Sequence, residues 1–231
     1  MNHQLALAIQ LNQQATLEDF CWAENPLLQQ QLNNTLNAQG ERFIFLWGKT
    51  GCGKSHLLQA CCQAMTQSGR TSAYLPLTLL QEWGPESIEG MENHALIAID
   101  DIELISHDKV WEEALFHLYN RVRDNEKTLL LISSKQTPAA LDLQLPDLRS
   151  RLGSGLVLPI YELSDELKIS VLQQQANKRG FQLTEQVAFF LLNRCDRNMH
   201  ALQQVLEQLD KASLIEQRKI TIPFVKAILK V

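Results

Sequence analysis

The sequence predicts an α/β protein in which a parallel sheet is flanked by helices and followed by a small all-helical domain. Short apolar runs alternate with helical patterns from residue 43 onward, which is typical of a parallel sheet covered on both faces. After residue 159 the strand-like runs stop and helical patterns remain. The length of 231 residues suits one large domain or two small ones.

The sheet is predicted from five apolar runs. They cover residues 43–47, 71–77, 95–100, 128–134 and 156–160. Helices are predicted over residues 54–67 and 109–123, where apolar residues recur at helical spacing. Residues 145–156 form a turn-rich segment that leads into the last strand.

The all-helical domain is predicted from four helical patterns after the last strand. Ser164 is expected to cap a helix that runs to Gly180, and Thr184 to cap a second one. A third helix is predicted over residues 199–216 and a short fourth in the stretch ITIPFVKAIL.

Composition excludes several classes of protein. The net charge is −5, and no run of Lys or Arg is longer than two, so a basic face that grips nucleic acid directly is not expected. Five cysteines without metal-like spacing indicate reduced thiols. No stretch approaches the roughly 18 apolar residues of a membrane span, and the N-terminus lacks a secretory signal pattern. We therefore expect a cytoplasmic protein with no membrane partner.

The stretch GKTGCGKS fits the phosphate-loop pattern. Its members are Gly48, Lys49, Thr50, Gly51, Cys52, Gly53, Lys54 and Ser55. Glycines at this spacing let backbone N–H groups turn inward around the α- and β-phosphates, while the Lys reaches the β/γ oxygens and the Ser hydroxyl ligates Mg²⁺. The helix that follows adds the positive end of its dipole. The sequence therefore predicts a site for ADP or ATP with Mg²⁺.

Two further motifs carry charges that suit phosphate chemistry. The apolar run ALIAIDD ends in Asp100, which can hold the Mg²⁺ hydration shell, and in Asp101, which can orient an attacking water. The segment LPDLRSRLGSGL contains Arg149 and Arg151. Arginines beside a turn are ordinarily solvated, but a guanidinium can also reach a phosphate on another subunit as an arginine finger.

The N-terminal stretch QLALAI has large apolar residues at every second position. Such a strand pattern can bind a partner by lying in a groove as an extended peptide. The alternative is that it packs on the sheet of this protein.

The order of these motifs resembles that of AAA+ ATPases of the replication-initiator DnaA clade. The resemblance covers nearly the whole chain and rests on the phosphate loop, the IDD strand end, the LLLISS strand, LRSRLGSGL and the helical lid. QLALAI is similar to a sliding-clamp-binding peptide, and the sequence ends after the lid without the helix-turn-helix domain that an initiator uses on DNA. The chain therefore resembles the DnaA-homologous regulators of this clade, which promote hydrolysis of initiator-bound ATP on the DNA-loaded clamp.

This resemblance implies a negative regulator of replication initiation that carries ADP or ATP with Mg²⁺. Its partners would be the initiator DnaA and the sliding clamp (the β subunit of the polymerase), with DNA contacted only through the clamp; a homo-oligomer stays open. The implied parts are a clamp-binding segment (1–15), an AAA+ nucleotide-binding domain (16–161) and a helical lid (162–231).

The resemblance also assigns residues to roles. Arg151 would be the trans-acting arginine finger, and Asp101 would act in catalysis. The nucleotide would be held by the phosphate loop with His56, Phe20, Asn25 and His200, and Mg²⁺ by Ser55 and Asp100. Partner contacts would come from Gln4, Leu5, Leu7 and Ile9 for the clamp, and from Phe116 and Asn120 for the initiator.

Two departures from the family pattern concern the chain's own hydrolysis. Lys135 replaces an acidic residue after the fourth strand, and His200 stands where the lid arginine is expected, with Arg197 three residues earlier. Both changes predict weak or absent ATPase activity. Two other functions remain open: a helicase-loader-like module that binds single-stranded DNA, and a P-loop kinase of small molecules, although the lid is poor in the arginines that such a kinase uses.

Overall fold

The structure is a computed structural model that describes residues 15–230. It consists of two compact units. Within the described residues, the sheet unit contains residues 15–49 and Lys54–Ile160, and the helical unit contains Thr50–Gly53 with residues 161–230. The residues expected to bind the clamp lie outside the described part of the chain; they are Gln4, Leu5, Leu7 and Ile9.

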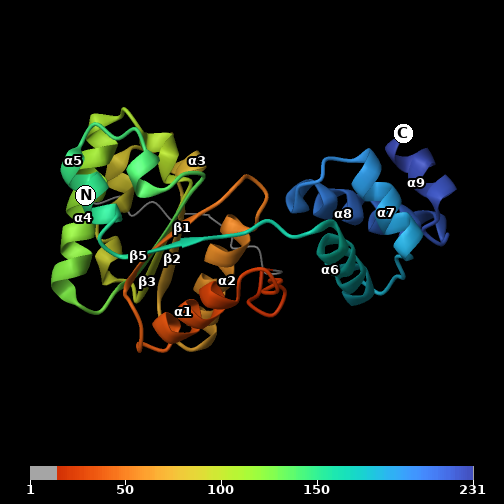
Figure 1. The fold of residues 1–231 in the computed structure, drawn as a ribbon, viewed down its shortest axis with the longest axis horizontal. Coiled ribbons are helices and arrows are strands. Elements are labelled where there is room, and N and C mark those ends of the chain that lie inside the picture. Colours follow the sequence, from red (N-terminus) through yellow and green to blue (C-terminus); the bar gives the residue numbers. More distant parts are fainter. Residues whose placement is uncertain (1–14, 231) are drawn as a thin grey trace, which may run out of the picture. The chain divides into compact units, whose positions relative to one another are not determined.

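Within residues 15–230, the sheet unit is built on five parallel strands in the order β2-β3-β4-β1-β5 (Figure 1). The strands are β1 (Phe43–Trp47), β2 (Ser72–Pro76), β3 (Leu96–Asp100), β4 (Leu129–Ser134) and β5 (Leu156–Pro159). Each lies within one of the predicted apolar runs, so the predicted parallel sheet is confirmed. Trp47 pairs with Ser134, and Pro76 pairs with Asp100. The carboxyl ends of these strands therefore lie along one edge of the sheet, where open α/β sheets bind their ligands.

Helices cover both faces of the sheet, with α1 and α2 on one side and α4 and α5 on the other (Figure 1). The helices are α1 (Pro26–Leu36), α2 (Lys54–Gln67), α3 (Leu77–Leu80), α4 (Lys109–Asn125) and α5 (Pro146–Leu152), with the 3-10 turns η1 (Pro85–Ile88), η2 (Met91–Asn93), η3 (Ile102–Ile105) and η4 (Pro138–Ala140). Alternate strand residues such as Phe45, Ile97 and Ile132 form one core with Trp111 and Leu115 of α4. Burying strands on both faces explains why they are continuous apolar runs in the sequence.

The turn-rich segment over residues 145–156 contains a helix that the sequence did not indicate, because residues 146–152 form α5. Pro146 occupies the first helical position, where its missing N–H costs nothing. Leu148 and Leu152 lie four residues apart and are both buried, so they fix one face of the helix on the core. The short helix depends on this packing and carries little signal of its own.

The five cysteines are all free thiols, as predicted. Cys61 and Cys62 on α2 are fully buried. Burial raises the pKa of Cys62 to about 12 and raises that of Cys61 further. Both side chains therefore serve as small apolar core residues.

The helical unit packs four helices around a separate core that includes Leu191, Leu206 and Phe224. The helices are α6 (Asp165–Lys178), α7 (Glu185–Arg194), α8 (Met199–Glu216) and α9 (Ile222–Leu229). Each begins after a residue whose side-chain oxygen accepts a backbone N–H of the first turn; these residues are Ser164, Thr184, Asn198 and Thr221. The two caps predicted from the sequence are thus confirmed.

None of the helices described in residues 15–230 combines the length and the apolar character needed to cross a bilayer.

Candidate functional site

The phosphate loop joins the end of β1 to the first turn of α2. Gly51 and Gly53 have φ values of +82° and +101°, which favour glycine over any other residue. They turn the chain just before α2, whose first N–H groups have no partner within the helix. The ammonium of Lys54 is buried and donates to the carbonyl oxygens of Gly48 (2.8 Å) and Lys49 (3.0 Å). Free N–H donors beside a held cation fit the phosphates of a nucleotide.

The Asp100 carboxylate, buried at the end of β3, is held by two hydroxyl groups. Ser133 on β4 donates to Oδ1, and Tyr74 on β2 donates to Oδ2 at 2.6 Å. The hydroxyl of Ser55 also hydrogen-bonds the Tyr74 phenol. Ser55 and Asp100, the two residues predicted to hold Mg²⁺, therefore both hydrogen-bond the Tyr74 phenol. Hydroxyl and carboxylate oxygens are ligands that suit Mg²⁺.

Tyr74 is a residue of this site that the sequence analysis missed. Burial and the neighbouring Asp100 charge raise its pKa well above the usual value, so the phenol stays protonated and acts as a donor. Its position within a buried strand gives no local sign of this role, because the contact depends on how β2 pairs with β3.

Asp101 follows β3 in the left-handed region, with φ +59° and ψ +51°. Its N–H donates to the Ser133 hydroxyl at 3.1 Å. Burial raises the pKa of the Asp101 carboxyl, as do the charges of Asp100 and Glu103, while Lys54 and Lys135 act in the opposite direction. Asp101 is thus a carboxyl with increased basicity at the edge of the sheet where the phosphate loop begins.

Lys135 forms an ion pair with Glu103. Its ammonium lies 3.3 Å from Glu103 Oε1, and its N–H donates to Glu103 Oε2 at 3.3 Å. Since Trp47 pairs with Ser134, Lys135 comes directly beside the start of the phosphate loop. A basic residue therefore lies beside the phosphate loop, bonded to Glu103.

The segment expected to border the nucleotide base packs against the first turn of α2. The rings of Phe20 and His56 lie 6.2 Å apart, and Phe20 also contacts Trp22 at 4.5 Å. A ring nitrogen of His56, Nε2, lies 3.2 Å from the Thr16 carbonyl oxygen. Burial lowers the pKa of His56, although the Thr16 carbonyl and Asp19 oppose this shift. The structure therefore brings Phe20 and His56 together at the first turn of α2, while Asn25 is buried just before α1.

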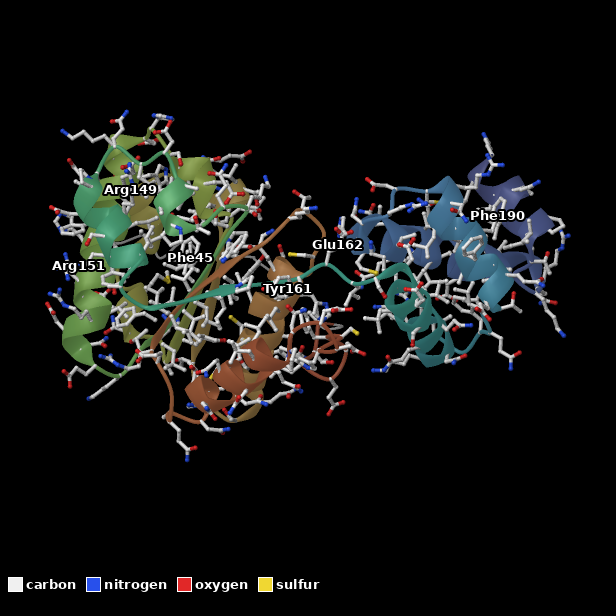
Figure 2. The ribbon with its side chains drawn as sticks, viewed as in Figure 1. Phe45, Arg149, Arg151, Tyr161, Glu162 and Phe190 are labelled. Carbon is white, nitrogen blue, oxygen red and sulfur yellow. The ribbon has the colours of Figure 1, made fainter. Side chains whose placement is uncertain are left out.

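Arg149 and Arg151 both lie on α5, at the outer side of the sheet unit, with Phe45 of β1 deeper inside (Figure 2). Arg149 Nη2 donates to the carbonyl oxygen of Leu143 at 2.5 Å, which ties it to its own loop. The guanidinium of Arg151 is only partly exposed and has no hydrogen bond or ion pair with any residue of the described chain. The two arginines therefore differ: the Arg149 guanidinium is bonded within its own loop, whereas that of Arg151 is available to bond another molecule.

The two residues expected to contact the initiator lie on α4. Phe116 is partly buried against the core. The side-chain oxygen of Asn120 is buried and has no hydrogen-bond partner within residues 15–230. Tyr119 of the same helix lines a small void together with Arg151, so α4 and the arginine of α5 share one face of the sheet unit.

The predicted lid position belongs to the helical unit. The His200 ring is exposed on α8, with Nε2 3.0 Å from the side-chain nitrogen of Gln204. Arg197 lies 3.4 Å from Asp165 and also bonds Asn193, so its guanidinium is engaged within the helical unit.

Two family models match different parts of the chain. The model described as Hda, lid domain, matches residues 165–229, and the model for the bacterial DnaA ATPase domain matches residues 86–159. These ranges correspond to the helical unit and to the part of the sheet unit that contains β3, α4, β4 and α5.

Several solved structures share the fold. Domain III of the replication initiation protein DnaA from Thermotoga maritima is 23% identical, with 96% of this chain and 98% of that chain covered and a TM-score of 0.81. AMPPCP-bound DnaA from Aquifex aeolicus is 25% identical, with 89% and 68% covered and a TM-score of 0.73. The Holliday junction branch migration motor RuvB of Thermotoga maritima is 16% identical, with 96% and 73% covered and a TM-score of 0.70. The two family models and the shared fold agree: residues 86–159 match the bacterial DnaA ATPase domain, residues 165–229 match the Hda lid domain, and the chain as a whole is similar to Hda/DnaA-like AAA+ proteins.

Proposed function

We propose that this protein is a nucleotide-bound regulator that stimulates ATP hydrolysis on the replication initiator DnaA. It supplies Arg151 in trans to the initiator's nucleotide and is recruited by the DNA-loaded sliding clamp. The result is a negative regulator of replication initiation.

The first support is the chain's own phosphate loop. The positive-φ glycines, the held Lys54 and the free end of α2 suit a diphosphate, and Ser55 with Asp100 would complete a Mg²⁺ site. When bound, Mg²⁺ neutralises phosphate charge. The relative from Aquifex aeolicus is AMPPCP-bound, which supports nucleotide binding here. We propose ADP as the resident nucleotide.

The chain's own hydrolysis is proposed to be weak. Burial raises the pKa of Asp101, but the positive charge of Lys135 at the neighbouring strand end opposes that rise and so reduces the basicity that a catalytic carboxylate needs. His200 offers the lid an imidazole, which is smaller than an arginine and is not permanently charged. The protein would then act by activating its partner's ATPase and not as a fast ATPase itself.

The observation that carries the proposal is the guanidinium of Arg151, which has no hydrogen bond or ion pair with residues 15–230. Arginine fingers contribute by meeting a phosphate on a neighbouring subunit, and they must be free of partners in their own chain to do so. Arg149, tied to Leu143, does not meet this requirement. Phe116 and Asn120 on the adjoining α4 would contact the initiator around the same face.

The clamp tether is proposed for Gln4, Leu5, Leu7 and Ile9, in the extended-peptide mode of recognition. Deleting residues 1–10 is expected to abolish retention on immobilised clamp while the melting temperature and ADP affinity change little. A truncated protein that still binds the clamp, or that unfolds readily, would contradict the tether.

The decisive experiment measures ATP hydrolysis by purified DnaA with and without this protein, in the presence and absence of DNA-loaded clamp. Stimulation that needs both the protein and the loaded clamp supports the proposal. No stimulation, together with a gel shift of single-stranded DNA at physiological salt, would favour the helicase-loader reading. Phosphoryl transfer to a small molecule would favour the kinase.

A further inference from the structure

A glutamate on α4 is completely buried although no cationic side chain of residues 15–230 is bonded to it. The Glu112 side chain has an exposed fraction of 0%. Such a carboxylate is stable inside a protein only when its oxygens accept enough hydrogen bonds. Nothing in the phosphate-loop chemistry uses this residue, so its partners indicate what it does.

In the described part of the chain, the Glu112 carboxylate accepts three hydrogen bonds, all from backbone N–H groups. Oε1 accepts from His107 (3.1 Å) and from Gln144 (3.1 Å), and Oε2 accepts from Leu145 (2.7 Å). His107 precedes α4, whereas Gln144 and Leu145 precede α5. The carboxylate therefore joins the beginnings of two helices that are more than 30 residues apart in sequence.

Helix α5 has little else to fix its beginning. It is seven residues long, no side chain caps it, and its first residue is Pro146, which has no N–H. Arg149 closes the preceding loop on itself by donating to Leu143. A second link, between His107 and Asp142 at 3.1 Å, is largely exposed to solvent and is therefore weak.

We propose that Glu112 is a positioning residue that sets the start of α5 and thereby the place from which Arg151 reaches a partner's phosphate. Leu148 and Leu152 hold one face of α5 on the core, and the bonds from Gln144 and Leu145 fix its position along and around its axis. The consequence for a partner's hydrolysis rests on the proposed function; the anchoring of the loop does not.

The chemistry requires a carboxylate. Three N–H donors need two acceptor oxygens, and both oxygens of Glu112 are used. An amide has one acceptor oxygen, and its NH₂ group would face an N–H donor. Glu112→Gln therefore keeps the shape of the side chain but leaves at least one buried N–H without an acceptor.

The test compares Glu112→Gln with Glu113→Gln in the full-length protein. Glu113 is the next residue on α4, exposed and in an i,i+4 pair with Lys109, so its replacement gives the same charge change without the anchor. We expect Glu112→Gln to speed amide hydrogen exchange at Gln144 and Leu145 by more than about tenfold, since it removes their acceptor. Glu113→Gln should leave both amides as slow as in the unaltered protein.

The effect on a partner should appear in the maximal rate. A displaced catalytic group costs on the order of 10²-fold in rate, so DnaA hydrolysis at saturating Glu112→Gln protein should fall by about that factor. The half-saturating concentration and ADP affinity should stay within about twofold, because neither depends on the loop. Loss that disappears on cooling, in step with the folded fraction, would mean a merely structural role and would overturn the proposal.

A double variant separates the two proposals. If Glu112 acts through Arg151, the double variant Glu112→Gln/Arg151→Ala should stimulate DnaA hydrolysis as much as Arg151→Ala alone; a further loss of stimulation overturns the positioning role. If Arg151→Ala has no effect, the proposed function fails while the exchange result still decides the anchor. If Glu112→Gln does not fold, amide hydrogen exchange of the unaltered protein provides the test. Fast exchange at Gln144 and Leu145 overturns the proposal that Glu112 anchors this loop, and slow exchange supports it.

Discussion

Two regions of the sheet unit present charged side chains: the phosphate-loop edge, with Lys54 and Asp100, and the α4–α5 corner, with Glu112 and Arg151. The charged groups of the two regions have different kinds of hydrogen-bond partner. At the edge, Lys54 is held by two carbonyl oxygens and Asp100 by two hydroxyl groups of the same unit. At the corner, Glu112 is satisfied by backbone N–H groups while Arg151 has no partner in the described chain. The edge is organised to receive a small ligand. The corner is organised to complete a site on another molecule, and the predictions below test this difference.

The largest effect is expected from Arg151→Ala. Because a trans arginine finger contributes on the order of 10³–10⁵ in rate, stimulated hydrolysis by DnaA should fall by that order. The variant's melting temperature and own ADP affinity should not change, which a thermal shift assay with and without ADP measures. Arg149→Ala is the matched control and should be milder, because that guanidinium serves its own loop. If Arg149→Ala is inactive and Arg151→Ala active, the assignment of the corner is reversed.

The next effect is expected from Lys54→Ala at the edge. A ligand at 100 times its dissociation constant stabilises the folded state by about 2.7 kcal/mol, and this term should vanish when the cation is removed. Calorimetric melting at saturating ADP measures it, with the ligand-free proteins as reference. Equal melting temperatures of variant and unaltered protein in saturating ADP would show that the edge does not bind nucleotide through Lys54.

A smaller effect is expected from Tyr74→Phe, which removes a donor to the buried Asp100 carboxylate. The free energy of unfolding without nucleotide should drop by about 1.5 kcal/mol, as expected for a hydrogen bond to a charged group. Denaturant titration measures it. Tyr119→Phe is the comparison: its phenol bonds the neutral Ser154 hydroxyl at 3.0 Å, so its loss should be smaller. An equal loss at the two tyrosines would argue against a charged acceptor at the edge.

The smallest effect concerns pH and His56. Burial holds its folded pKa below the ordinary value, so its contribution to stability is fully present above pH 6.5 and is lost as pH falls toward the folded pKa. The slope is at most about 1.4 kcal/mol per pH unit. Unfolding at pH 7 and pH 5 should therefore show a smaller acid loss in His56→Gln than in the unaltered protein. Asp101 has a raised pKa, so its contribution to stability changes with pH in the opposite direction. This contribution is the same in both proteins and cancels in the comparison. An identical pH dependence would place His56 in contact with solvent.

How far the sequence predicts each region follows from the distance over which its contacts are made. The phosphate loop is a local motif, so spacing alone places Gly48 and Lys54, and the strand ends follow from apolar runs. Helix α5 was missed because its packing on α4 decides it. The Tyr74–Asp100 bond spans 26 residues and the Glu112–Leu145 bond spans 33, so neither leaves a local pattern.

The paired cysteines of α2 have a consequence for how the fold opens. Only a thiolate reacts with alkylating reagents, and Cys61 and Cys62 are both buried and held protonated. Reaction at these positions requires α2 to separate from the sheet, whereas Cys21 and Cys195 are partly accessible in the folded state. The alkylation rate of Cys61 and Cys62 therefore reports how often the structure beneath the phosphate loop opens. A bound ligand that stabilises the folded state would slow alkylation of the two buried sulfurs and leave alkylation of the two accessible ones unchanged.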